Sequence, residues 1–121
     1  MARILIAEDE AAVREFVRRA LVHHGHVVAA VEDGAAALEA LRLEDFDLLL
    51  TDIVMPVMDG IALALKVAKE HPTVRVLMMT GYSAEKQRAH NLDLLVHDVV
   101  TKPFTMEQIC STVEAALAAP R

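Results

Sequence analysis

The sequence predicts an α/β protein with a parallel sheet, and two observations support this fold class. Short apolar runs typical of buried strands alternate with segments whose apolar residues recur every three or four positions, as on one face of a helix. Five strands alternating with five helices require right-handed crossovers, which produce a parallel sheet covered by helices on both faces. The 121 residues, of which 55% are hydrophobic, suffice for one domain with a substantial core.

The strands are predicted at five apolar runs, which span residues 2–8, 26–31, 46–52, 74–80 and 98–101. The first, third and fourth are apolar almost throughout, as expected for strands buried on both faces of a parallel sheet. The third contains three consecutive leucines, Leu48 to Leu50, followed closely by the carboxylate of Asp52. A buried strand that ends on a carboxylate indicates that Asp52 lies where the strand leaves the core.

The first three helices are predicted from apolar stripes and from residues that begin or end a helix. The stripes consist of Val13, Phe16, Val17, Ala20 and Leu21, then Ala37, Leu38 and Leu41, then Ile61, Ala64, Leu65 and Ala68. Gly25 stands where a helix C-terminus favours glycine, Asp33 can cap the second helix, and Pro72 follows the third. Asp59 and Gly60 indicate a turn that starts the third helix.

The last two helices differ in the strength of their signals. Ser83 can cap a weaker helix over residues 85–90. Thr105 and Gln108 fit a T-x-x-Q capping box, which satisfies two main-chain N–H groups at a helix start. The stripe after this box consists of Ile109, Val113, Ala116 and Leu117.

Composition argues against several classes of partner. The net charge of −6 and the pI near 5.4 disfavour nucleic acid or an anionic membrane, because both bind basic surfaces. Cys110 is the single cysteine, so no intrachain disulfide can form and a reducing compartment is favoured. No apolar run approaches the roughly 18 residues of a membrane span, and the first residues are unlike a secretory signal. We therefore expect a cytoplasmic protein.

Polar side chains follow four of the predicted strands at their carboxyl ends. The first strand ends in Glu8 and Asp9, Asp52 ends the third, Thr80 ends the fourth and Lys102 follows the fifth. Ligands of open parallel sheets bind beyond the carboxyl ends of the strands. If the first strand is central, its two acids and Asp52 meet in one crevice.

The chemistry of this crevice points to a metal ion and phosphate. Glu8, Asp9 and Asp52 would repel one another and lose hydration, so they need a cation. With Lys102 they carry a charge of −2, which one divalent ion neutralises, and oxygen ligands without histidine or cysteine favour Mg²⁺. A lysine and the hydroxyl of Thr80 are suited to phosphate oxygens. The predicted chemistry is phosphoryl transfer to a carboxylate nucleophile.

Four motifs, in this order and spacing, resemble the receiver domain of response regulators, the CheY-like family. They are "LIAEDE", "LLLTDIVMPVMDG", "LMMTGY" and "VTKPF", and the resemblance covers essentially the whole chain, residues 1–121. It implies a flavodoxin-like, doubly wound five-stranded parallel sheet of strand order 2-1-3-4-5 with five helices. It also implies a switch in a two-component phosphorelay.

The resemblance implies a role for each residue of the crevice. Asp52 would accept a phosphoryl group from a histidine kinase or a histidine phosphotransfer protein. The Mg²⁺ ligands would be Asp9 directly, Glu8 through water, Asp52, and Val54 through its main-chain carbonyl. Thr80 would be the switch hydroxyl, and Lys102 would contact the phosphoryl group. The Lys102–Pro103 bond would be cis, which proline tolerates.

A narrower resemblance, in "MTGY" and "HDVVTKPF", is to CpdR-type single-domain response regulators, which act as adaptors for the ClpXP protease. We therefore expect a stand-alone receiver without a DNA-binding domain, whose phosphorylation controls binding to a protein target, with ClpXP as the candidate. It would not be an enzyme beyond self-catalysed phosphorylation and slow dephosphorylation. The alternative is a phosphorelay intermediate that passes the phosphoryl group to a histidine phosphotransfer protein.

The chain departs from the family pattern at two places. Receivers often carry an aromatic residue three positions before the lysine, where this chain has Val99, so the readout of the switch must differ; Tyr82 and His97 are candidate substitutes. The missing aromatic also argues against a chemotaxis motor switch.

Val54 stands where an aspartate-nucleophile phosphatase needs a second acid, which argues against that enzyme class. Val54 and Tyr82 would flank the water that attacks the aspartyl phosphate, and neither orients water well, so we expect a long-lived phosphoryl group.

Overall fold

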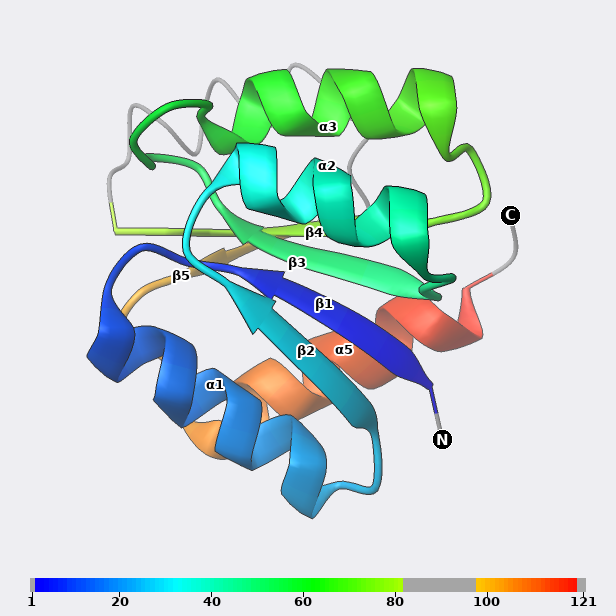
Figure 1. Ribbon diagram of the computed structural model, residues 1–121. Helices are drawn as coiled ribbons and strands as arrows, with labels where there is room; N and C mark the ends of the chain where they lie inside the picture. The colour runs from blue at the N-terminus through cyan, green and yellow to red at the C-terminus, as the bar shows by residue number, and fades with distance from the viewer. Residues whose placement is uncertain (1, 82–97, 120–121) are drawn as a thin grey trace.

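Five parallel strands form one sheet with helices on both of its faces (Figure 1). The computed structural model describes residues 2–81 and 98–119. The strands are β1 (Arg3–Ala7), β2 (Val27–Val31), β3 (Leu48–Asp52), β4 (Arg75–Thr80) and β5 (Asp98–Thr101). Their order in the sheet is β2-β1-β3-β4-β5, and all neighbours are parallel. The predicted sheet and its strand order are confirmed, with β1 inside the sheet between β2 and β3.

Four helices are present in the part of the chain that the structure describes. They are α1 (Ala11–His23), α2 (Gly34–Leu43), α3 (Gly60–Glu70) and α5 (Met106–Ala118). In Figure 1, α2 and α3 cover one face of the sheet, whereas α1 and α5 cover the other. The fifth predicted helix, over residues 85–90 with Ser83 as its cap, lies outside the described residues.

The helix ends agree with the residues predicted to set them. Asp33 and Asp59 each accept a 2.8 Å hydrogen bond from the main-chain N–H three residues later, at the starts of α2 and α3. Thr105 and Gln108 form both hydrogen bonds of the capping box at the start of α5. Gly25, with a φ of 93°, follows the end of α1 in the left-handed conformation that glycine adopts without steric penalty.

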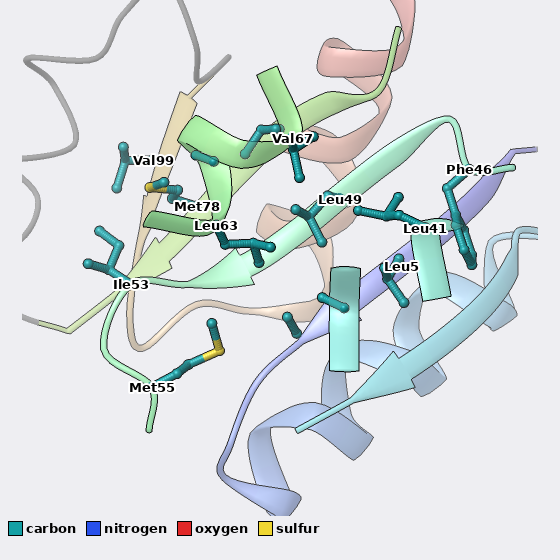
Figure 2. Close-up of a cluster of buried hydrophobic side chains, with 14 residues drawn as sticks. Leu5, Leu41, Phe46, Leu49, Ile53, Met55, Leu63, Val67, Met78 and Val99 are labelled. Carbon is teal, nitrogen blue, oxygen red and sulfur yellow. The ribbon is translucent and has the colours of Figure 1, made fainter. Parts of the chain in front are cut away.

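The core has two layers because successive side chains of a strand point to opposite faces of the sheet. Figure 2 shows the layer beneath α2 and α3, where Leu5 and Leu49 from the sheet pack with Leu63 of α3. Leu48 and Leu50 point to the opposite face and pack beneath α1 and α5. The three leucines of β3 are therefore fully buried on both faces.

The first four strands begin one or two residues later than the apolar runs predict. Phe46 is buried but precedes β3, and the Arg3 guanidinium lies 5.4 Å from the centre of its ring. The Asp47 carboxylate accepts a 2.8 Å hydrogen bond from the Arg3 main-chain N–H. Main-chain hydrogen bonds also join Asp47 to Arg3 and to Arg75, so the segment before β3 already lies alongside its neighbours. Apolar character alone could not distinguish this buried segment from the strand itself.

Candidate functional site

The sheet brings the predicted polar residues to one edge. Asp52 and Thr80 are the last residues of β3 and β4, while Glu8 and Lys102 directly follow β1 and β5. In the parallel pairing of β3 with β4, Asp52 stands opposite Met79, one residue before Thr80. Because all the strands run in the same direction, their carboxyl ends and the side chains there lie along one edge of the sheet.

Three carboxylates converge at this edge of the sheet. Glu8, Asp9 and Asp52 each offer one oxygen, and these oxygens all lie within 4.8 Å of one another. Glu8 is fully buried and Asp52 is 6% exposed, whereas Asp9 is exposed. This is the one group of three acidic, histidine or cysteine ligands that the described residues bring together. An all-oxygen donor set of this kind fits a hard cation such as Mg²⁺.

Lys102 links two of the three carboxylates. Its Nζ donates to Glu8 Oε1 at 2.7 Å and to Asp52 Oδ2 at 3.2 Å. The lysine is thus held more closely by Glu8 than by Asp52. Because the pair with Glu8 is largely removed from water, each charge depends on the other for stabilisation.

Burial controls the charge of Glu8. Removal from water raises the pKa of this carboxyl to about 7, and the nearby charge of Asp52 acts in the same direction. Hydrogen bonds from Lys102 and from the Glu10 N–H oppose this rise. Burial also acts to lower the pKa of Lys102, but the hydrogen bonds and negative charges of Glu8 and Asp52 outweigh it and raise that pKa. Lys102 therefore stays charged, whereas Glu8 titrates near neutral pH.

The main chain around Asp52 fixes the orientation of its carboxylate. The Ile53 N–H donates to Asp52 Oδ1 at 2.8 Å, so each carboxylate oxygen of Asp52 has a hydrogen-bond donor. Thr80 is also buried, and its carbonyl accepts a 2.7 Å hydrogen bond from the main-chain N–H of Lys102. This bond ties the ends of β4 and β5 together. The predicted cis bond between Lys102 and Pro103 is confirmed.

The loop after β3 presents exposed apolar side chains. Val54, which follows Asp52 by two residues, is 46% exposed. Val57 is 82% exposed and has a φ of 70°, at the centre of a γ-turn closed by a hydrogen bond from Met58 N–H to the Pro56 carbonyl. A β-branched residue is strained in this conformation.

Arg14 is a residue of the site that the sequence analysis missed. Its guanidinium, on α1, donates a 2.8 Å hydrogen bond to the main-chain carbonyl of Glu8. The available signal was a basic residue near the start of the helix that follows the acids, but sequence alone does not show which carbonyl an arginine reaches. The predicted substitutes for the missing aromatic, Tyr82 and His97, lie outside the described residues, and Val99 is buried in the core (Figure 2).

Comparison with known proteins decides the family. The sequence pattern of the response regulator receiver domain family matches residues 4–114 of the chain. The chain belongs to this family. A receiver domain is the signal-accepting part of a two-component system, so the predicted resemblance is confirmed.

Relatives of the receiver domain include single-domain proteins. The response regulator receiver protein CpdR of Brucella abortus is 39% identical over 119 residues, which are 98% of this chain and 99% of that protein. This likeness agrees with the predicted resemblance to CpdR-type regulators. The chain spans about half the length of other curated relatives that it matches.

Solved structures of receivers share the fold. The chemotaxis response regulator CheY4 of Vibrio cholerae is 25% identical with a TM-score of 0.88, over 96% of this chain and 98% of that one. The response regulator TrrA of Thermotoga maritima, solved in complex with Mg²⁺-BeF, is 27% identical with a TM-score of 0.86, over 96% and 99%. None of the helices in the described part of this receiver is long and apolar enough to cross a membrane.

Proposed function

We propose that this receiver domain is a phosphorylation-controlled switch in which Asp52 accepts a phosphoryl group from a histidine kinase or a histidine phosphotransfer protein. The observation that carries the proposal is the convergence of three carboxylates and Lys102 at the carboxyl edge of the sheet. Lys102 bonds two of these carboxylates at the ends of the adjacent strands β1 and β3. Such an arrangement is suited to phosphate and a hard cation.

Asp52 would act as the nucleophile. One of its carboxylate oxygens attacks phosphorus, the bond from phosphorus to the donor's imidazole nitrogen breaks, and that nitrogen keeps the electron pair. The Ile53 N–H donates a hydrogen bond to Oδ1 and restrains it. Lys102 donates to Oδ2 and can donate instead to the phosphoryl oxygens when the phosphoryl group is bound. Thr80, buried at the end of β4, supplies a hydroxyl at the same edge.

The acids would hold Mg²⁺ through Asp9, Asp52 and the main-chain carbonyl of Val54, with Glu8 acting through water. When bound, Mg²⁺ supplies positive charge that balances the acids and the incoming phosphoryl oxygens. The mutual distances of the carboxylate oxygens fit one such ion. Lys102 would then exchange part of its interaction with Glu8 and Asp52 for the phosphoryl group.

Phosphorylation would change the affinity of this receiver for a protein target, and we take the ClpXP protease as the target to test first. The likeness to CpdR over nearly the full length of both chains supports a single-domain mode of action. A cytoplasmic location is part of the same proposal. The acidic net charge of −6 makes nucleic acid a poor partner for the domain itself.

Phosphorylation of Asp52 is tested with acetyl phosphate and Mg²⁺, followed by intact-mass spectrometry. Wild type should gain one phosphoryl group and Asp52→Asn none. Asp45→Asn, which alters an exposed aspartate at the opposite edge of the sheet, should be labelled like wild type. Equal labelling of wild type and Asp52→Asn would remove Asp52 from its proposed role.

The downstream step is tested with purified partners. Binding of the ClpX unfoldase to wild type, with and without acetyl phosphate, should differ, and Asp52→Asn should not respond. Rapid transfer of the phosphoryl group from Asp52 to a histidine phosphotransfer protein, with no change in ClpX binding, would instead identify a phosphorelay intermediate.

A further inference from the structure

The turn that carries Asp9 is closed by hydrogen bonds on both sides. On the amino side, the carbonyl of Glu8 accepts the 2.8 Å hydrogen bond from Arg14 Nη1. On the carboxyl side, the Glu10 N–H donates to Glu8 Oε2 at 3.1 Å. The Glu8 N–H is itself bonded to the Val31 carbonyl at 3.1 Å. Both peptide groups that flank Asp9 are therefore fixed to partners.

Within residues 2–81 and 98–119, the side chain of Asp9 has no such support. It is exposed, and none of the described residues forms a hydrogen bond with its carboxylate. Its direction is consequently set by the main chain of the turn. Of the two bonds that hold the flanking peptide groups, only the one from Arg14 comes from outside the turn, because the other is made by the Glu8 side chain within it.

We propose that Arg14 is a positioning residue for the Mg²⁺ site: it anchors the peptide between Glu8 and Asp9 and thereby points the Asp9 carboxylate at the ion. This inference rests on the proposed function, because it assumes that Asp9 and its neighbours bind Mg²⁺. Fixing a ligand in its bound direction before the ion arrives removes part of the entropy lost on binding. Outer residues that orient metal ligands typically change metal affinity by about 10–100-fold.

The sign of the effect separates positioning from simple electrostatics. The guanidinium is a positive charge next to a cation site, so its charge alone repels Mg²⁺. If charge were its whole influence, replacing Arg14 with a neutral residue would tighten Mg²⁺ binding. If Arg14 positions Asp9, the same replacement weakens binding although it removes a repulsive charge.

The test compares Arg14→Gln, Arg14→Lys and Arg19→Gln with wild type. Arg19 lies on the same helix, is 73% exposed and pairs with Glu15, so its loss removes equal charge without touching the turn. Mg²⁺ affinity is measured from the rise of Tm with Mg²⁺ concentration and by calorimetric titration. The rate of phosphorylation by acetyl phosphate is then measured across the same Mg²⁺ range.

We expect Arg14→Gln to bind Mg²⁺ about tenfold more weakly than wild type. Arg19→Gln should bind at least as tightly as wild type. The Mg²⁺ affinity of Arg14→Lys should lie between those of Arg14→Gln and wild type, because lysine keeps the charge but lacks the planar set of N–H donors of a guanidinium. Saturating Mg²⁺ should return the phosphorylation rate of Arg14→Gln close to the wild-type value, which a general loss of structure would not allow.

Two outcomes for a folded Arg14→Gln and for wild type overturn the inference. Unchanged or tighter Mg²⁺ binding by Arg14→Gln would do so while leaving the proposed function intact. Absence of Mg²⁺ binding by wild type would overturn both together. If Arg14→Gln does not fold, Arg14→Lys decides alone: weaker binding than wild type at unchanged charge upholds the inference, and wild-type binding overturns it.

Discussion

Gly60 packs directly against the main chain of Asp52. A Cβ atom on Gly60 would lie 2.1 Å from the Asp52 carbonyl oxygen and 2.9 Å from the Ile53 Cα, both closer than van der Waals contact allows. The Gly60 N–H also donates a 2.7 Å hydrogen bond to the Ile53 carbonyl. Gly60, the first residue of α3, thus holds the main chain in place at Asp52, the last residue of β3.

Replacing Gly60 with alanine should therefore damage both stability and the site. Because the clash is with main-chain atoms rather than a flexible side chain, we expect a loss of about 3 kcal/mol in the free energy of unfolding. Urea denaturation measures the loss, and acetyl phosphate labelling reports on Asp52. Gly81→Ala is the control, since its nearest contact would be Lys102 Cβ at 3.9 Å. Equal stability of the two variants would contradict the packing argument.

Local sequence patterns were enough to predict the start of α3, but not why it needs glycine. Asp59 and Gly60 indicated a turn that starts the helix, and in the structure Asp59 caps it. The close approach of Gly60 to Asp52 depends on how the loop folds back over the strand, which no periodicity encodes. The same limit applies at Phe46. Its apolar character predicted a strand residue, but in the structure it is a buried residue that precedes β3.

The convergence of the acids was predictable because topology alone places it. Once strands are parallel and β1 is central, Glu8, Asp9 and Asp52 must leave the sheet at one edge. The hydrogen bonds that orient them were not predictable, because they depend on which particular atom each donor reaches in the folded chain. Arg14 illustrates this, since its partner is a carbonyl rather than a side chain.

Loss of Lys102 should destabilise the metal-free protein in a pH-dependent way. Lys102→Met leaves the fully buried Glu8 without its cation, at a cost of about 1–3 kcal/mol at pH 8. At pH 5, below the pKa of about 7, Glu8 is protonated and needs the lysine less, so the loss should shrink. Urea denaturation in EDTA at both pH values measures this. Lys66→Met, at an exposed position on α3, should show neither the loss nor its pH dependence.

Glu8 should make the metal-free protein less stable as pH rises from 5 to 8. Its pKa is about 7 in the folded protein and near its ordinary value of 4.5 in the unfolded chain. Between these values the folded state holds a proton that the unfolded state has released, so the stabilisation present at low pH is lost as pH rises through 7. Glu8→Gln lacks this carboxyl and should show a flatter stability profile over that range.

The control for Glu8→Gln is a carboxyl that titrates outside the range. The hydrogen bond from Arg18 lowers the pKa of Glu15 to about 2, so Glu15→Gln should keep the wild-type slope between pH 5 and 8. All three proteins are compared in EDTA, because bound Mg²⁺ would itself change proton uptake. A Glu8→Gln profile as steep as that of wild type would show that Glu8 is not the titrating group.

The lifetime of the aspartyl phosphate should depend on Val54. Hydrolysis needs a water in line with the bond between phosphorus and the Asp52 oxygen, and a side chain that orients this water speeds the reaction. Val54 follows Asp52 by two residues and is half-exposed, but its side chain has no group that can hold a water. Tyr82, the second residue expected to flank the water, lies outside the described residues.

Val54→Asn should therefore shorten the lifetime of the phosphoryl group at least several-fold, because its amide can hold the attacking water. The decay of phosphorylated protein is followed by intact-mass spectrometry in Mg²⁺ after removal of acetyl phosphate. Val57→Asn introduces the same amide three residues further along the same loop, at a more exposed valine, and should decay like wild type. If both variants decay at the wild-type rate, water access is controlled elsewhere. If both decay faster by the same factor, polarity of the loop rather than the position of Val54 governs hydrolysis.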